Sequence, residues 1–434
     1  MRGCWENWLR GFPRLFFLVL FAYASVAAAQ HEGHKPPASH EAEPLEAMSE
    51  HAASGTSIEP RSTPHAMWHS TAGSWRLMVH SNAFLVSTQQ SGPQGRDKLF
   101  GINWAMLSLD RGVGRGNLAV RAMVSFEPAT VTRRRYPLLF QTGETAFGAP
   151  LINAQHPHDL FMELAARYSL PLREHTSFYV YVAPVGDPAL GPVAFPHRTS
   201  AAELPTAPLG HHLQDSTHIA ASVLTVGLAN HRWRLEASTF RGREPDEERW
   251  DFDPGEPDSW SARLTLLPAS DWVVQVSHGR LNEPEEHEAG DIDRTTASVS
   301  FNRRLERGNW ATTLLWGRNH KRPSRANLNG FLLESSVQFR DRNYLFGRLE
   351  NLDREGLFLT GNPEAEPIER VAAFTIGAAR DLWTPPHCRL ALGFDLSLHR
   401  IPAVLRPLYG EHPIGARLFL RLRLGSTAMH NHQN

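Results

Sequence analysis

The sequence RLALGFDLSLH, residues 389–399, decides the fold. Leucine or phenylalanine stands at every second position from Leu390 to Leu398, and the positions between them are polar, charged or small. Because successive side chains of a β-strand point to opposite faces, this alternation predicts a strand with one apolar and one polar face. FLLESSVQFR at residues 331–340 and RLFLRLRL at residues 417–424 repeat the pattern. Charged residues are too frequent on the second face for a packed interior.

The connections between such segments separate two architectures that share this local pattern. A soluble sandwich turns its polar faces to solvent, whereas a membrane barrel turns its apolar faces to lipid and its polar faces to the lumen. Short connections, such as 171–174 and 307–308, alternate along this chain with long ones, such as 128–157 and 185–215. That rhythm is typical of up-and-down barrels with their short turns on the periplasmic side. The predicted strands are residues 73–88, 99–110, 117–127, 158–170, 175–184, 216–229, 231–241, 258–268, 271–281, 294–306, 309–318, 328–340, 342–352, 369–382, 387–400 and 414–424.

We therefore predict an all-β fold, a closed up-and-down antiparallel transmembrane β-barrel of about 16 strands, within a range of roughly 14–18. Tryptophans near predicted strand ends fit the headgroup level of a membrane; they are Trp260, Trp272, Trp310, Trp316 and Trp383. Polar-face residues are assigned to the lumen, where they either line a pore or form a plugging network. They include Arg234, Glu236, Arg263, Arg304, Glu334, Arg389, Asp395, Arg421 and Arg423.

The first 29 residues have the layout of a cleaved signal peptide. Arginines precede the apolar run LFFLVLFAYA at residues 15–24, and Ala27–Ala29 offer a small-residue cleavage site. The run is shorter than the roughly 20 residues of a membrane-spanning helix. We expect a signal peptide at 1–29, a disordered periplasmic tail at 30–70, the barrel at 71–425 and a polar tail at 426–434. The expected location is the outer membrane of a Gram-negative cell, with membrane lipid and the barrel assembly machinery as partners.

Net charge and cysteine content argue against two features, a nucleic-acid partner and an internal disulfide bond. The formal net charge of −1 gives no reason to expect nucleic acid as a partner. The two cysteines are Cys4, inside the signal peptide, and Cys388, so the mature chain forms no internal disulfide. An exported chain without disulfides needs another source of stability, such as a sheet closed on itself.

The tail predicted at residues 30–70 is rich in histidine and also holds methionine. Imidazole and thioether together suit copper, whereas a solvated linker that happens to contain histidine is an equal alternative. The residues concerned are His31, His34, His40, His51, His65, His69, Met48 and Met67.

Two long loops concentrate groups able to bind a transition metal, either copper or zinc. Imidazole and carboxylate are the usual ligands of these ions, and two histidines separated by one residue reach a single ion from extended backbone. The alternative is that these side chains cap strand ends and fix the loop backbone. The candidate ligands are His156, His158 and Asp159 at the end of the second long loop, and His197, His211, His212, Asp215 and His218 in and after the third.

Two further functions stay open. Ser216, His218 and Asp159 have the residue types of a nucleophile, base and orienting acid, as in a hydrolase of lipid or envelope esters. No sharp nucleophile turn accompanies them, so a catalytic role is the less favoured prediction. The other alternative is a plugged barrel with a structural or adhesive role. The favoured prediction is a porin-like barrel that binds or passes a small polar solute or a metal ion.

Four tracts resemble an uncharacterised family of predicted bacterial outer-membrane β-barrel proteins. They are QHPHDLFMEL at residues 155–164, PVGDPALGP at 184–192, LGHHLQDSTHI at 209–219 and GREPDE at 242–247, and the resemblance covers roughly residues 70–300. Genes of this family often accompany heavy-metal or copper handling systems, so the resemblance implies a metal-related role. It carries over no assigned binding or catalytic residue.

Overall fold

The computed structural model describes residues 53–64, 67–215, 220–285, 290–360 and 366–425. The predicted signal peptide, residues 30–52 of the predicted tail and the tail at 426–434 lie outside these ranges. So do Ser216 and His218 of the hydrolase alternative.

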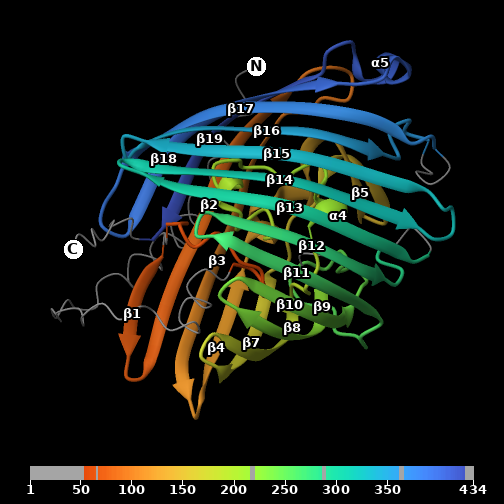
Figure 1. The fold of residues 1–434 in the computed structure, drawn as a ribbon. Helices are drawn as coiled ribbons and strands as arrows, with labels where there is room; N and C mark the ends of the chain where they lie inside the picture. The colour runs from red at the N-terminus through yellow and green to blue at the C-terminus, as the bar shows by residue number, and fades with distance from the viewer. Residues whose placement is uncertain (1–52, 65–66, 216–219, 286–289, 361–365, 426–434) are drawn as a thin grey trace. The chain divides into compact units, whose positions relative to one another are not determined.

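A single antiparallel sheet forms the wall of a closed barrel (Figure 1). The sheet has 17 strands, of which β1 (Trp68–Ala72) pairs with the start of β2, so that 16 form the ring. Ring closure is given by the pairing of β19 with β2 and by the unbroken ladder from β2 through β9 and β10. The ring strands are β2 (Trp75–Gln90), β3 (Lys98–Val113), β4 (Gly116–Val124), β7 (Phe161–Arg173), β8 (Thr176–Gly186), β9 (Ala220–Asn230), β10 (Trp233–Arg241), β11 (Ser259–Ala269), β12 (Trp272–Leu281), β13 (Ile292–Leu305), β14 (Gly308–Lys321), β15 (Asn327–Phe339), β16 (Asn343–Arg354), β17 (Glu369–Trp383), β18 (Cys388–Arg400) and β19 (Ile414–Leu424).

The predicted fold class, strand number and rhythm of connections are confirmed. Each predicted strand corresponds to one ring strand, with boundaries shifted by a few residues. Connections on one rim are short, such as 114–115 and 270–271, and those on the other rim are longer, such as 125–160 and 187–219. The two rims are therefore distinct, and the histidine-rich loops lie on the long-loop rim.

The alternating pattern places apolar side chains outside and polar side chains inside. On β15, Phe331 and Leu333 are exposed, whereas Glu334 between the outward positions is fully buried in the lumen. Trp260 and Trp272 are exposed near the starts of their strands, at opposite rims. Such an apolar band with aromatic residues at its borders is the exterior of an outer-membrane barrel. None of the helices within the described residues is long and apolar enough to cross a membrane.

Three features were not predicted as ordered structure. The second long loop contains a hairpin of β5 (Tyr136–Ala146) and β6 (Ala149–Gln155). Residues 53–64 and β1, placed in the disordered tail by the sequence, are ordered, and Arg263 donates from the wall to the hydroxyl of Thr56. Lumen side chains supply hydrogen-bond partners for this segment, since Arg234 also donates to the carbonyl oxygen of Thr56 at 3.0 Å. The helical turns are α3 (Glu127–Thr130), η1 (Thr132–Arg134), η2 (Thr199–Ala201), α4 (His211–Gln214), η4 (Ala403–Leu405) and α5 (Arg406–Tyr409).

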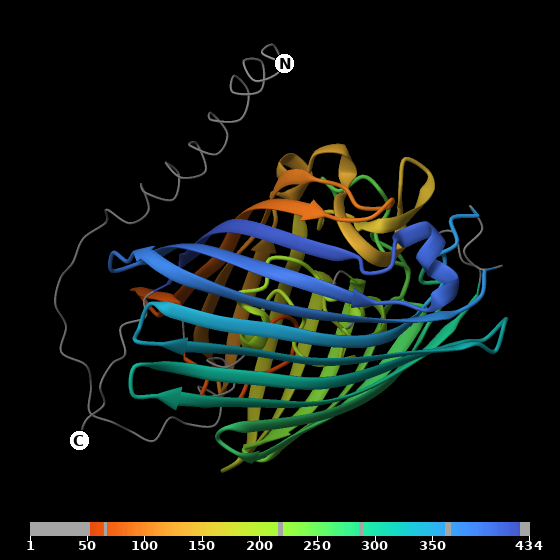
Figure 2. The same ribbon diagram turned by 90° about the horizontal axis from the view of Figure 1, so that it is seen from above.

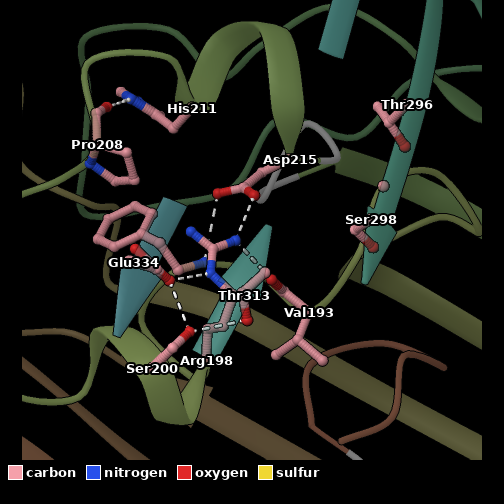
Figure 3. Close-up of polar contacts among 12 residues, drawn as sticks. Val193, Arg198, Ser200, Pro208, His211, Asp215, Thr296, Ser298, Thr313 and Glu334 are labelled. Carbon is pink, nitrogen blue, oxygen red and sulfur yellow. Dashed lines mark hydrogen bonds and ion pairs between the residues drawn. The ribbon is translucent and has the colours of Figure 1, made fainter. Parts of the chain in front are cut away.

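The third long loop folds into the lumen and is held there by buried ion pairs. Arg198 lies between Asp215 of the same loop and Glu334 of β15, and Ser200 also donates to Glu334 (Figure 3). Further along the loop, Glu203 forms an ion pair with Arg421 of β19. Buried charges of this kind are tolerated only when they are paired and hydrogen-bonded. The loop therefore forms part of the filling of the barrel, as Figure 2 shows from above.

A glycine in the wall makes room for helix α4 of this loop. A Cβ at Gly317 of β14 would lie 2.1 Å from the carbonyl oxygen of Leu213, far inside van der Waals contact. The missing side chain lets the helix backbone touch the sheet. This contact fixes the position of His211 and His212 along the barrel axis. Asn319, on the same strand, donates a hydrogen bond to the carbonyl oxygen of His212 at 3.1 Å.

Candidate functional site

Three candidate histidines from two loops converge at the long-loop rim. His156 follows β6, and His211 and His212 open helix α4. Their rings are close, with centroids 4.1 Å apart for His211 and His212 and 6.4 Å apart for His156 and His212. One ligand nitrogen from each lies within 4.8 Å of the other two, and all three side chains are buried. We call this group the rim cluster.

Glutamates surround the rim cluster from three further segments. Oε1 of Glu144 in β5 lies in close contact with Nε2 of His156 and 3.6 Å from Nε2 of His212. Nδ1 of His212 lies 3.4 Å from Glu244 and 3.8 Å from Glu285. Glu144, His212 and Glu244 also form a group of possible metal ligands within 4.8 Å of one another. Imidazole and carboxylate donors are thus interleaved around His212.

Backbone carbonyls orient two of the three rings. Nδ1 of His156 lies 2.7 Å from the carbonyl oxygen of Pro157, and Nδ1 of His211 lies 2.8 Å from that of Pro208. A hydrogen bond from Nδ1–H to a carbonyl fixes the tautomer and turns Nε2 into the electron-pair donor. This is the orientation that metal-binding histidines commonly have.

Electrostatics differ sharply between neighbouring histidines. Burial, reinforced by Arg249 and His212, holds the pKa of His156 well below its ordinary value, so its ring is neutral. Burial also lowers the pKa of His212, but the carboxylates of Glu244, Glu285 and Glu144 outweigh it and raise the pKa to about 10. Without a bound cation, a proton on His212 balances the excess carboxylate charge.

The other described candidates contribute no ligand atom to the rim cluster, although the ring of His158 lies beside that of His156. His158 contacts Glu127, with Nδ1 and Oε1 3.0 Å apart, and its ring centroid is 6.5 Å from that of His156. Asp159 pairs with Arg249 at 3.0 Å, and burial raises its pKa to about 7 against the opposing effect of that arginine. Asp215 pairs with Arg198 in the lumen. His218 lies outside the described residues.

His197 belongs to a different part of the lumen. Its Nε2 lies 2.8 Å from Sδ of Met123, and its ring packs against Trp104 and His80. Burial, with His80 and Arg121 nearby, holds the pKa of His197 well below its ordinary value. This residue therefore does not join the rim cluster.

Glu144 lies in the same long loop as the predicted ligand His156. The sequence does not single out the other two glutamates of the cluster, Glu244 and Glu285. Glu244 stands in a loop dense in charge of both signs and Glu285 in an acidic loop, and nothing in either loop marks one glutamate over its neighbours. Only the ring order of the strands brings these loops beside helix α4.

Comparisons with known proteins show what this chain is similar to. No family model and no curated protein matches the sequence. Among solved structures, an anion-selective porin from Comamonas acidovorans has a TM-score of 0.52 and 9% identity, over 80% of this chain and 99% of that one. OmpF of Salmonella typhi, in complex with daunomycin, has a TM-score of 0.49 and 8% identity over 82% and 100%. The expected link to copper handling is not tested by these likenesses and stays a prediction. What the likeness to the first porin shows is the fold, a 16-stranded outer-membrane β-barrel.

Proposed function

We propose that this protein is an outer-membrane barrel that binds a transition-metal ion at the rim cluster and passes this ion, or a small polar solute, through the lumen. The observation that carries the proposal is the convergence of His156, His211 and His212 from two loops far apart in the sequence. Cation binding there would replace the proton on His212 as the partner of the surrounding glutamates.

The donor set favours a divalent ion of intermediate softness. Nitrogen and carboxylate oxygen donors suit zinc and copper(II), whereas magnesium and calcium prefer oxygen alone. Ligand atoms on one tetrahedral zinc ion, at about 2.0–2.2 Å each, lie roughly 3.5 Å from one another. The present separations, within 4.8 Å, require only small side-chain movements to reach that geometry.

Metal content of the refolded full-length chain tests the binding part. Purified protein is loaded with Zn²⁺ or Cu²⁺, passed over a desalting column and measured by mass spectrometry. The double variant His211→Ala/His212→Ala is expected to lose one bound ion and to weaken the affinity on the order of 100-fold or more, beyond the cost of losing an outer-shell partner. The tail histidines are present in every sample, so the difference reports the rim cluster.

His158→Ala is the matched control. It also removes a buried histidine of the same loop, yet His158 pairs with Glu127 and contributes no nitrogen to the group of converging ligand atoms. We expect it to keep the bound ion. Equal metal content in wild type and the double variant, with both folded by their electrophoretic mobility before boiling, contradicts the binding proposal.

A second candidate function, a plugged structural barrel, is favoured by the ion pairs that hold the third loop inside the lumen. Planar bilayer recording separates the two functions. If small ions pass through the lumen, the wild type shows discrete conductance steps. If folded protein shows no such steps, the plugged barrel is favoured. The metal measurement is independent of this outcome.

A further inference from the structure

The methionines of the described residues gather in one part of the barrel. Met67, Met78 and Met106 line a small cavity. Met106 also packs with Met123 and Met162 in a buried group, so all five belong to one contiguous region. They come from β2, β3, β4, β7 and the residue before β1, and they are Met67, Met78, Met106, Met123 and Met162. Leucine fills apolar space equally well, so this accumulation of thioethers in a polar lumen needs another explanation.

Two histidines point their nitrogens at two of these sulfurs. Nε2 of His80 lies 3.2 Å from Sδ of Met106, and Nε2 of His197 lies 2.8 Å from Sδ of Met123. The two imidazole rings are neighbours, with centroids 5.7 Å apart, and Met106 packs against Met123. A thioether is a weak hydrogen-bond acceptor. Two imidazole–thioether pairs side by side therefore resemble a set of ligands more than a set of hydrogen bonds.

We propose that His80, His197, Met106 and Met123 bind a soft monovalent metal ion of the Cu⁺ or Ag⁺ class. Thioether sulfur selects soft ions, and imidazole completes the set. The site lies inside the wall formed by β2, β3 and β4, and the third loop supplies His197 from the lumen side. It involves none of the rim-cluster residues, so it stands whether or not the rim cluster binds metal.

Charge near the site favours a monovalent ion over a divalent one. All four proposed ligands are uncharged, and no carboxylate is among them. The adjoining cavity is lined by Arg121 and Arg167, and Arg121 is paired with Glu163 at 3.0 Å. Repulsion from arginine grows with the charge of the ion, and the interior screens it weakly. The rim cluster has the opposite character, since its carboxylates suit a divalent ion.

Space and spacing fit a single ion. A cavity of about 30 Å³, large enough for one small ion or water, adjoins two of the four proposed ligands, His80 and Met106. Donors on a tetrahedral ion at about 2.0–2.3 Å lie roughly 3.5 Å apart. To reach that spacing, the two nitrogen–sulfur distances, 2.8 and 3.2 Å, would have to open by about 0.7 and 0.3 Å. Trp104 lies against both imidazole rings, with centroid distances of 4.9 Å to His80 and 4.3 Å to His197.

Methyl NMR of the full-length chain in detergent micelles tests the proposal, with Ag⁺ as the probe because it has no redox chemistry under these conditions. Methionine methyl groups are labelled with ¹³C, and each signal is assigned by a Met→Leu variant. Addition of Ag⁺ is expected to shift the methyl signals of Met106 and Met123 together, before those of the other methionines. Saturation of Ag⁺ elsewhere with these two signals unmoved overturns the proposal.

Variants of nearly equal volume sharpen the test. Met106→Leu/Met123→Leu is expected to weaken Ag⁺ binding on the order of tenfold or more, because only the soft donors are lost. Met78→Leu is the matched control, since Met78 lines the same cavity without being a proposed ligand. If the control weakens binding as much as the double variant, the assignment of ligands is wrong.

The same samples separate this site from the rim cluster. The methionine double variant is expected to keep its Zn²⁺, and His211→Ala/His212→Ala is expected to keep the Ag⁺-dependent shifts. Loss of both ions in either variant means that the two sites are not independent and overturns the assignment of a separate soft-metal site.

Discussion

The wall of the barrel and the chain packed inside it are held by different forces. In the wall, each ring strand is hydrogen-bonded to the next ring strand along the chain or closes the ring, so its contacts are regular and mostly local. In the lumen, single ion pairs join residues far apart, such as Arg198 with Glu334 and Arg421 with Glu203. The wall therefore tolerates changes that keep its alternation, whereas the lumen filling depends on individual side chains.

Among the residues packed inside the lumen, Arg198 is the one whose replacement we expect to destabilise the third loop most. Replacement by methionine keeps most of the volume but leaves Asp215 and Glu334 buried without this partner. Breaking a buried pair in this way costs about 3–5 kcal/mol. We expect Arg198→Met to release residues 187–215 from the lumen, which hydrogen exchange measured by mass spectrometry detects as faster exchange of that loop.

Arg307→Met is the control for this change. Arg307 pairs with Asp341 at 2.6 Å on the short-turn rim, where the arginine side chain is 65% exposed and solvent screens the pair. Exposed pairs contribute about 0–1 kcal/mol, so exchange of the loop is expected to stay unchanged. Equal effects of the two variants contradict a specific role of Arg198 in holding the loop.

The wall is most sensitive on its lipid face. Leu333 stands at the centre of β15 and points outward. Arginine at the bilayer midplane costs about 2–4 kcal/mol, and the cost falls to about 0–1 kcal/mol near the interface. We expect Leu333→Arg to lower the free energy of unfolding in urea by that larger amount, and Val337→Arg, nearer the short-turn rim, by much less. A reversed order argues against the membrane position assigned to β15.

The wall was predictable because its signal is local. The alternation from Leu390 to Leu398 survives in the structure as an outward apolar row, and Asp395 between them is buried in the lumen as predicted. Most residues assigned to the lumen from the sequence are buried, but Arg304 is exposed and donates to the carbonyl oxygen of Ser62 at the short-turn rim. Its place beyond the end of the regular alternation explains the difference.

The filling was not predictable because its signal is not local. Met106 and Met123 lie on neighbouring strands, but His197 reaches them only because the third loop turns inward. The β5–β6 hairpin lies inside the predicted loop at residues 128–157. Its backbone departs from regular strand geometry, with Phe140 and Glu144 at positive φ, so its sequence does not show the regular alternation of a strand. Of the rim cluster, the histidines were named from residue type, and their convergence follows from the ring order of the strands.

The segment of residues 53–64 offers a pH-dependent test of the filling. Burial raises the pKa of Glu59 from 4.5 to about 7, although the backbone N–H of Thr199 and the charge of Arg198 oppose the shift. Glu59 accepts a hydrogen bond from that N–H at 2.8 Å, which joins the segment to the third loop. Below about pH 7 the buried carboxyl is therefore mostly protonated.

A raised pKa in the folded state means that the contribution of Glu59 is fully present below pH 4.5 and is lost as the pH rises through about 7. At about 1.4 kcal/mol per unit of pKa, the loss is at most about 3.5 kcal/mol. Hydrogen exchange of residues 53–64, corrected for the intrinsic effect of pH, is therefore expected to be faster at pH 8 than at pH 5. Glu59→Gln keeps an acceptor for Thr199 but has no charge, so its exchange should be equally slow at both values. If Glu59→Gln keeps the pH effect, the effect comes from another titratable side chain of the lumen and not from Glu59.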